Sequence, residues 1–395
     1  MSLPEPSATT AAARIMDGFA RDTGIEPDGP QRRYLWTDAF AVCNYLGLYR
    51  AGGEERHLRR ALRLVDRVHH VLGRHREDDT QRGWISGLSD EEGEEHPTAG
   101  GLRIGKPEPE RGPGEAHHPA SEWDRDGQYY HYLTRWMHAL VRTWSVTGDA
   151  RFQRWAVELA EAAQRAFVQR TDDGRGLWWK MSIDLSRPLV PSMGQHDPLD
   201  GYVALREIRD ATPTPHGGPA HHPPLEGELR ELRELCSGGS WVTRDPLGTG
   251  ALLVDLLFLA RLEGRATGNR SAEEERRDRE ILSRLASAAA GSLEEFSRTR
   301  EMAQPARARL AFRELGLSIG LAAVERLPDP GEGDALTPTA EEALSGLRRH
   351  LPLRKRIDAF WMDPAHQQAL TWTEHGDINE VMLATVLAPG GYLDI

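Results

Sequence analysis

The sequence predicts an all-α fold in which six helical hairpins form a closed (α/α)6 toroid, with short strands confined to the loops. Apolar residues recur at three- and four-residue steps through most of the chain, as they do along one face of an α-helix. The predicted helices also alternate, because a helix that is apolar on nearly all sides is followed by an amphipathic one. A helix without a wettable face has to be internal, so each pair reads as an inner helix and its outer partner.

The clearest pair lies between Ser121 and Phe167. A polar loop with three acids precedes a helix whose apolar stripe includes Leu133, Trp136 and Leu140. Gly148 is expected to cap the end of this helix, and Asp149 the start of the next. The other side of the first helix carries His131, Arg135, His138 and Arg142.

The remaining pairs follow in chain order. Inner helices are predicted at residues 34–50, 199–210, 247–263, 307–327 and 378–388, and outer helices at residues 54–72, 225–236, 272–296 and 339–350. One outer helix is missing, so we expect the helix at residues 8–21 to close the ring against the last inner helix. Its Ile15 and Phe19 are predicted to pack near Val381 and Met382.

We expect residues 1–395 to form a single toroid domain with one long insertion at residues 73–123. The insertion is rich in Gly, Pro and acids, and it is too long for an ordinary connection. Two interpretations stay open at this point. The insertion is either a surface loop or an active-site lid that brings Arg103 and Lys106 over a pocket.

The composition limits the classes of function. Lys and Arg number 49 against 61 for Asp and Glu, and this net charge of −12 disfavours nucleic-acid binding. The two cysteines, Cys43 and Cys236, give no disulfide framework and fit a reducing compartment. No apolar run has the length of a signal peptide or a membrane span, so we expect a cytoplasmic protein without a membrane partner. Zinc-ligand spacing, phosphate loops and dinucleotide motifs are missing, so no metal or cofactor is expected.

Tryptophans and acids recur at corresponding positions of the repeat. The acids stand at the starts of inner helices, and they are Asp38, Asp126, Asp197, Asp200, Asp245 and Asp377. Each acid alone is explained as a helix N-cap. Together they would line one central funnel, because the inner helices all start at the same end of the ring. Tryptophans beside these acids suit a saccharide, whose apolar faces stack on indole and whose hydroxyls bond to carboxylates.

Two segments resemble the six-hairpin (α/α)6-toroid glycosidase-like superfamily, which includes unsaturated glucuronyl hydrolases and N-acylglucosamine epimerases. Residues 36–52, from Trp-Thr-Asp-Ala-Phe to Leu-Tyr-Arg-Ala-Gly, resemble the first hairpin of these enzymes. Residues 142–152 resemble their inner-to-outer turn. The resemblance covers most of the chain and implies the fold and carbohydrate-active chemistry. No catalytic signature of a single family transfers whole.

Glycoside hydrolysis requires two carboxyl groups, and Asp126 and Asp197 are the predicted pair. Asp124 is a reserve, and His131 and His196 are predicted to hold the substrate or to act in catalysis. The further predicted substrate contacts are Trp36, Asp38, Trp123, Tyr130, Trp178, Lys180, Asp200, Trp241, Asp245, Trp372 and Glu374.

Two other functions stay open. A sugar epimerase or isomerase would use histidine as acid and base, because imidazole titrates near the working pH. A non-catalytic toroid would bind a carbohydrate or act as a scaffold. In each case the partner is a small molecule or an oligosaccharide, and the sequence leaves the sugar, the linkage and the oligomeric state undetermined.

Overall fold

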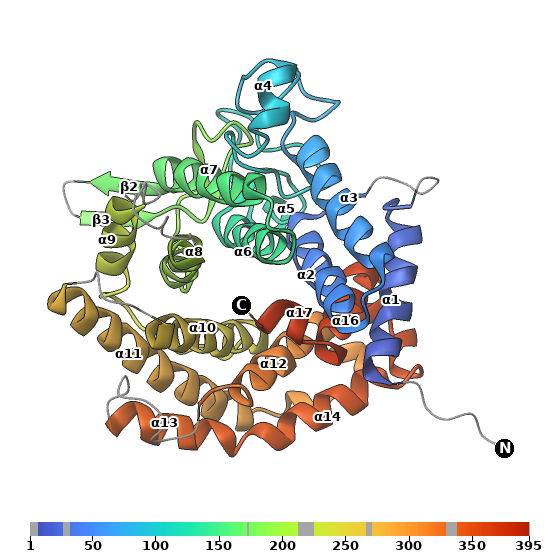
Figure 1. Ribbon diagram of the computed structural model, residues 1–395, viewed down its shortest axis with the longest axis vertical. Helices are drawn as coiled ribbons and strands as arrows, with labels where there is room; N and C mark the ends of the chain where they lie inside the picture. The colour runs from blue at the N-terminus through green and yellow to red at the C-terminus, as the bar shows by residue number, and fades with distance from the viewer. Residues whose placement is uncertain are drawn as a thin grey trace. The chain divides into compact units, whose positions relative to one another are not determined.

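The computed structural model describes residues 7–26, 32–171, 174–211, 225–265, 271–328 and 338–394. Helices predominate and the strands are short, which confirms the all-α class (Figure 1). The α-helices are α1 (Ala8–Asp22), α2 (Leu35–Gly52), α3 (Glu55–Leu72), α4 (Asp90–Glu95), α5 (Pro119–Glu122), α6 (Tyr130–Thr147), α7 (Ala150–Phe167), α8 (Asp197–Ala211), α9 (Glu226–Leu235), α10 (Pro246–Arg265), α11 (Ala272–Ser297), α12 (Ala311–Val324), α13 (Pro338–Arg348), α14 (Leu351–Met362), α15 (Leu370–Thr373), α16 (Gly376–Leu387) and α17 (Gly390–Leu393). The 3-10 helices are η1 (Glu301–Ala303), η2 (Ala306–Ala308) and η3 (His366–Gln368).

The chain forms two compact units. The N-terminal unit is Ala20–Leu235, and the C-terminal unit is Cys236–Ile395 together with Met1–Phe19. In the N-terminal unit α2, α6 and α8 lie side by side, and α3, α7 and α9 pack behind them (Figure 1). In the C-terminal unit α10, α12 and α16 form the corresponding row, with α11 behind α10 and α14 behind α12. Each unit therefore has the predicted inner and outer layers, while closure of one ring and a single domain stay predictions.

Helix α1 belongs to both units, because its residues up to Phe19 group with the C-terminal unit. Its buried face consists of Ala12, Met16, Phe19 and Ala20, whereas Ile15 is only half-buried. The inward pair is therefore Met16 and Phe19 rather than Ile15 and Phe19. The contact predicted between this helix and Val381 and Met382 stays a prediction.

The predicted turn between α6 and α7 is confirmed. Gly148 has a left-handed backbone with φ 70°, and its amide donates to the carbonyl of Trp144. Asp149 then accepts a hydrogen bond from the backbone nitrogen of Arg151 at 3.0 Å, which caps α7. Glycine tolerates this conformation because it has no side chain to clash with its own backbone.

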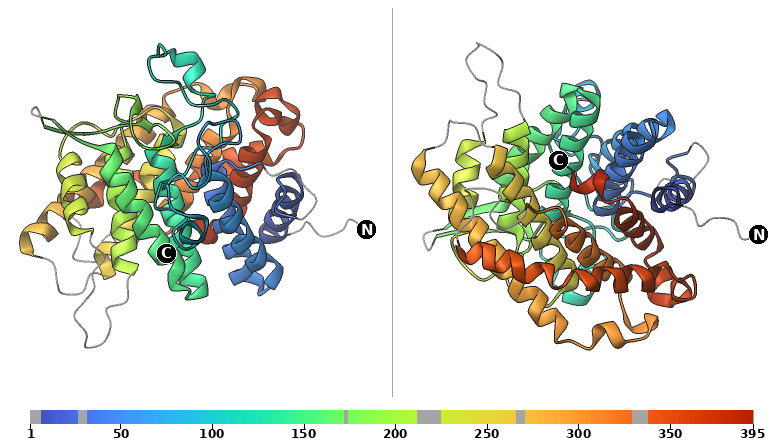
Figure 2. Two further views of the ribbon diagram at one scale, coloured as in Figure 1. Left: turned by 90° about the horizontal axis from the view of Figure 1, so that it is seen from above. Right: turned by 60° about the horizontal axis from the view of Figure 1, so that its bottom comes forward.

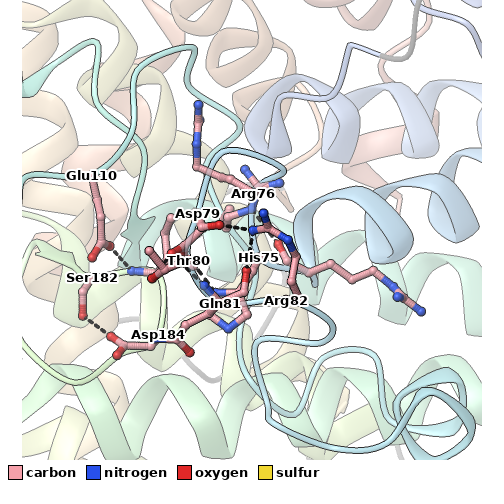
Figure 3. Close-up of polar contacts among 12 residues, drawn as sticks. His75, Arg76, Asp79, Thr80, Gln81, Arg82, Glu110, Ser182 and Asp184 are labelled. Carbon is pink, nitrogen blue, oxygen red and sulfur yellow. Dashed lines mark hydrogen bonds and ion pairs between the residues drawn. The ribbon is translucent and has the colours of Figure 1, made fainter.

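Residues 73–123 are largely built into the N-terminal unit. Leu102 and Ile104 are buried, and the Ile104 amide donates to the Gly127 carbonyl at 2.8 Å. Farther along, the Glu110 carboxylate accepts a hydrogen bond from the Ile183 amide, next to a Ser182–Asp184 contact (Figure 3). Figure 3 also shows the neighbouring turn, where His75 lies 3.3 Å from the Asp79 carboxylate. The central part of the insertion is thus fixed by backbone bonds, and the lid stays a prediction for the remainder.

Short strands form where the loops meet. Strands β1 (Gln128–Tyr129), β4 (Lys180–Met181) and β5 (Pro188–Val190) make one antiparallel sheet, in which Tyr129 is paired with Lys180. Strands β2 (Val168–Thr171) and β3 (Gly174–Leu177) form a separate hairpin after α7. The first sheet holds the start of α6 against residues 179–190, which matters for the site below.

The C-terminal unit packs α10 very closely against α12. A Cβ atom on Gly250 would lie 2.2 Å from the carbonyl oxygen of Gly316, and one on Gly320 would lie 2.6 Å from the Gly250 Cα. Only residues without side chains permit this approach. Helix α14, which also packs against α12, lies where the sequence predicted no helix. Helix α12 therefore lies against both α10 and α14, and Figure 2 gives two further views of the chain.

Candidate functional site

The first turns of α6 and α8 bring titratable side chains together in the N-terminal unit. The two helices are direct neighbours (Figure 1). Gly201 allows close contact here, because a Cβ atom at this position would meet the Tyr130 hydroxyl at 2.1 Å. The sequence Asp197-Pro198-Leu199-Asp200 places both acids in the first turn of α8. Residues three apart lie on the same side of a helix, so both carboxyl groups face α6.

Three polar pairs follow one another along the α6–α8 contact. His131 Nδ1 lies 3.7 Å from Asp197 Oδ1, and Arg135 donates to Asp200 at 2.8 Å. Farther along the helices, His138 Nδ1 lies 3.0 Å from both carboxylate oxygens of Glu207. We call these pairs the α6–α8 ladder. Its α6 members are the residues that the sequence placed on the side of the helix opposite the apolar stripe.

The two members of the first pair, His131 and Asp197, do not hydrogen-bond each other. Neither His131 Nδ1 nor Asp197 Oδ2 has a hydrogen-bond partner, although both atoms are buried. Burial, with a further contribution from the charge of Asp200, raises the pKa of Asp197 well above its usual range. Burial lowers the pKa of His131 to about 4. Burial therefore disfavours the charged form of each group in this pair, the carboxylate of Asp197 and the imidazolium of His131.

The next carboxyl group has a different environment. Asp200 accepts a hydrogen bond from the Arg135 guanidinium at 2.8 Å. One turn of α8 thus carries an acid whose charged form is disfavoured by burial and a second acid that is paired with arginine. Two carboxyl groups whose environments differ in this way are the usual arrangement for acid and base roles.

Aromatic rings surround His131. Its imidazole lies nearly parallel to the Trp179 indole with ring centroids 6.4 Å apart, and it stacks on Tyr129 at 5.4 Å. Tyr132 meets it edge-on at 4.8 Å and also shares a hydroxyl contact with Tyr34. The His131 side chain keeps 27% of its surface exposed, so the ring is enclosed but reachable.

Asp126, the predicted partner of Asp197, instead holds neighbouring loop segments together through hydrogen bonds. Its carboxylate is completely buried and accepts hydrogen bonds from Arg103 at 2.5 Å and from Arg76 at 3.4 Å. The backbone amides of Gly105 and Gly127 add bonds at 3.0 and 3.1 Å. A carboxylate with this many donors has little capacity left for a substrate, so the geometry favours a structural role.

Two other predicted acids cap helices. Asp38 is buried and accepts hydrogen bonds from Arg33 and from the Tyr34 amide at the start of α2. Asp245 accepts from the Gly248 amide at 3.0 Å at the start of α10 and pairs with Arg313 at 2.7 Å. Both satisfy backbone groups that a helix N-terminus leaves open.

The predicted aromatic contacts divide into core and surface residues. Trp36, Tyr130, Trp241 and Trp372 are buried, and Trp372 stacks on Trp361 with ring centroids 5.8 Å apart. Trp123 is 54% exposed and lies against Trp179, while Trp178 is half-buried. Only Trp123 is linked to the rings around His131.

The remaining predicted residues lie in varied surroundings. Lys180 is buried and forms an ion pair with Glu122 at 2.9 Å, and burial lowers its pKa. Asp124 and Glu374 are exposed, and His196 is half-buried immediately before Asp197. Of the predicted set, the structure groups His131, Asp197 and Asp200, with Trp123 joined to them through Trp179.

Sequence reasoning missed Arg135, Tyr132 and Trp179 as site residues. The run Tyr129-Tyr130-His131-Tyr132 was a usable signal, because such a density of rings around one histidine is unusual in a solvated loop. Trp179 owes its place to the pairing of β4 with β1, which single-sequence patterns do not reveal.

Among the described residues, no group of three or more His, Cys, Asp or Glu side chains is arranged to hold a metal ion. Within the same part of the chain, no helix combines the length and the apolar character needed to cross a membrane.

No protein-family model matches the chain, and no curated protein matches it in sequence. Solved structures do match. A family 76 glycoside hydrolase from a bovine Bacteroides thetaiotaomicron strain aligns with a TM-score of 0.53 and 11% identity, over 99% of this chain and 79% of that one. Cellobiose 2-epimerase from Spirochaeta thermophila DSM 6192 aligns with a TM-score of 0.50 and 12% identity, over 95% and 96%.

The alpha-1,6-mannanase of Salegentibacter sp. HEL1_6 aligns with a TM-score of 0.50 and 10% identity, over 97% of this chain and 99% of that one. Identities this low carry the fold and leave the chemistry to the site. The resemblance to the six-hairpin toroid superfamily is therefore confirmed, at the level of the fold.

Proposed function

We propose that the chain is a carbohydrate-active enzyme that cleaves glycosidic bonds at the first turn of α8. The observation that carries the proposal is the contrast between Asp197, a buried acid with a raised pKa, and Asp200, a carboxylate paired with Arg135. Cβ atoms three residues apart in a helix are separated by about 5–6 Å. Carboxyl groups on such positions can reach the separations that glycosidases use.

In this mechanism Asp197 donates its proton to the oxygen of the leaving sugar. Asp200 is the second carboxylate and supports the positive charge that develops on the sugar ring. A water molecule then adds its hydroxyl group to the anomeric carbon, and the proton it releases restores the acid form of Asp197. His131 lies 3.7 Å from Asp197 and is a neutral imidazole, because burial lowers its pKa to about 4. Asp200 thus takes the role that the sequence assigned to Asp126, whose oxygens are occupied by arginines and amides.

The neutral state of His131 favours a second candidate, sugar epimerisation or isomerisation. A neutral imidazole can remove a proton from a carbon next to a carbonyl group, and the protonated Asp197 can supply one to the oxygen. The fold similarity to a cellobiose 2-epimerase makes cellobiose the first sugar to try for this reaction. The third candidate, a binding protein without turnover, would need the aromatic rings but not the carboxyl pair.

One screen separates the three. The protein is incubated in heavy water with α-1,6-linked manno-oligosaccharides and with cellobiose. Release of reducing sugar without deuterium in the product supports hydrolysis. Deuterium at a carbon of an unbroken sugar supports epimerisation or isomerisation. Binding without either product would support the non-catalytic candidate and overturn the enzymatic ones.

A further inference from the structure

Trp123 is a large apolar side chain that stays exposed although it packs against a second indole. The indole is 54% exposed and meets Trp179 edge-on, with ring centroids 5.1 Å apart. An exposed indole is unfavourable in water. An exposed tryptophan that packs against a second indole is therefore a better candidate for a binding surface than a single exposed leucine.

Hydrogen bonds and ion pairs hold the segment that carries Trp123. The buried Lys180 ammonium donates to the Glu122 carboxylate, to the Glu122 carbonyl and to the Arg125 carbonyl, at 2.9, 2.9 and 2.8 Å. Arg111 lies 3.3 Å from the other oxygen of Glu122 and donates to the Leu189 carbonyl at 2.7 Å. The residues on either side of Trp123 are therefore tied to β4 and β5. Lys180 thus positions the segment that carries the indole.

Trp123 is joined through Trp179 to the rings that lie beside the acid. We call this set of rings the aromatic row, and it consists of His131, Tyr129, Trp179 and Trp123. Its spacings are 6.4 Å from His131 to Trp179 and 5.1 Å from Trp179 to Trp123. Tyr129 is buried and supports the row from behind, whereas His131, Trp179 and Trp123 are half-buried or exposed. Successive sugar units of an oligosaccharide can lie along these three rings. The Trp179 amide donates a hydrogen bond to the Ser192 carbonyl. The next residue, Met193, is a second exposed apolar side chain near this end of the row.

We propose that Trp123 is a distal sugar-binding subsite and that the substrate is an oligosaccharide which extends at least two units from the sugar held at Asp197 and His131. This inference rests on the proposed carbohydrate function and adds the length of the substrate to it. A single sugar at Asp197 would not reach Trp123, whereas a longer chain would contact both ends of the row.

The test measures binding, so it does not depend on turnover. Calorimetry is performed with α-1,6-linked mannose oligomers of two, three and four units, and with the matching β-1,4-linked glucose oligomers. The Asp197→Asn variant serves as the host, because it prevents conversion of the ligand. In this host, Trp123→Ala should lower the affinity for tri- and tetrasaccharides roughly tenfold, the size expected for loss of one aromatic stack. The affinity for the disaccharide should not change.

Two variants are controls. Trp123→Phe keeps a ring and should retain most of the affinity. Leu370→Ala removes a side chain that is 66% exposed in the C-terminal unit, and it should change nothing. The same loss at every oligomer length, no loss at any length, or no binding of any oligomer would each overturn the inference. Length-dependent loss in a protein that never turns a sugar over would support the subsite and reject the hydrolase.

Discussion

The two rows of inner helices are held together in opposite ways. In the N-terminal unit, α6 and α8 meet through the charged and polar pairs of the α6–α8 ladder, including His131 with Asp197 and His138 with Glu207. In the C-terminal unit, α10 and α12 meet through Gly250, Gly316 and Gly320, with backbone against backbone. Glycine contacts allow tight packing but contribute no side chain that could react. Buried acids lower the stability of a protein and are found preferentially at functional sites. For this reason we propose that the reaction takes place in the N-terminal unit.

The largest expected effect comes from Asp197→Asn. It removes the proton that the mechanism transfers, so turnover should fall roughly 10²–10⁴-fold on whichever sugar the screen identifies. The matched control is Asp245→Asn, which alters the cap of α10 in the C-terminal unit and should leave turnover nearly intact. Equal losses of turnover in the two variants would contradict the proposal that the reaction takes place in the N-terminal unit.

His138→Ala should be the most destabilising change in the ladder. It leaves the buried Glu207 carboxylate without its cationic partner, and the free energy of unfolding should fall by about 3–5 kcal/mol. The control is His131→Ala, seven residues earlier on α6, whose partly exposed ring makes no hydrogen bond to Asp197. In denaturant titration, the free energy of unfolding of this control should fall by less than about 1 kcal/mol. A small effect at His138 would mean that the ladder does not hold α6 to α8.

The same pair makes stability depend on pH. Burial acts to lower the pKa of His138, but the Glu207 carboxylate and Cys43 outweigh it and the pKa rises to about 9. A raised folded-state pKa contributes stability that is fully present below the unfolded value of about 6.5 and is lost as pH rises through 9. Wild type should therefore lose on the order of 2–3 kcal/mol between pH 6.5 and 9.5. The loss should vanish in His138→Gln, and an unchanged loss there would assign the effect to another group.

The smallest of the stability effects tests the other unit. Gly250→Ala would place a methyl group against the Gly316 carbonyl. The free energy of unfolding should therefore fall by about 1–3 kcal/mol. Gly264→Ala, in the same helix but with open space around it, should be neutral or stabilising by up to about 1 kcal/mol. If the two substitutions behave alike, α10 and α12 do not need glycine at their contact.

Much of the fold could be predicted from the sequence because helical periodicity is a local signal. The boundaries of α2, α3 and α11 agree with the predicted ranges to within about two residues, as ordinary for helix ends. Helix α14 was missed because residues 351–362 carry basic and apolar residues without a clean stripe. Closure of the ring depends on contacts between distant segments, about which local patterns say nothing.

The candidate site was only partly predictable. Asp197, Asp200 and His131 were singled out, but Asp126 looked equivalent to Asp197, since both precede or start an inner helix. What separates them is the set of neighbours: Arg103 and Arg76 arrive from residues 73–123 and occupy Asp126. Asp197 instead faces an imidazole that makes no bond to it. Such partners come from tertiary packing and cannot be read from spacing along the chain.

The central claim is that Asp197 holds its proton at neutral pH, and infrared difference spectroscopy tests it without any substrate. The spectrum of wild type at pH 7 minus that of Asp197→Asn should contain the carbonyl stretch of a buried, un-ionised carboxylic acid, because burial raises the pKa of Asp197 well above its usual range. Asp126→Asn, measured in the same way, should give a carboxylate difference only. A carboxylate band in place of the acid band for Asp197 would contradict the account.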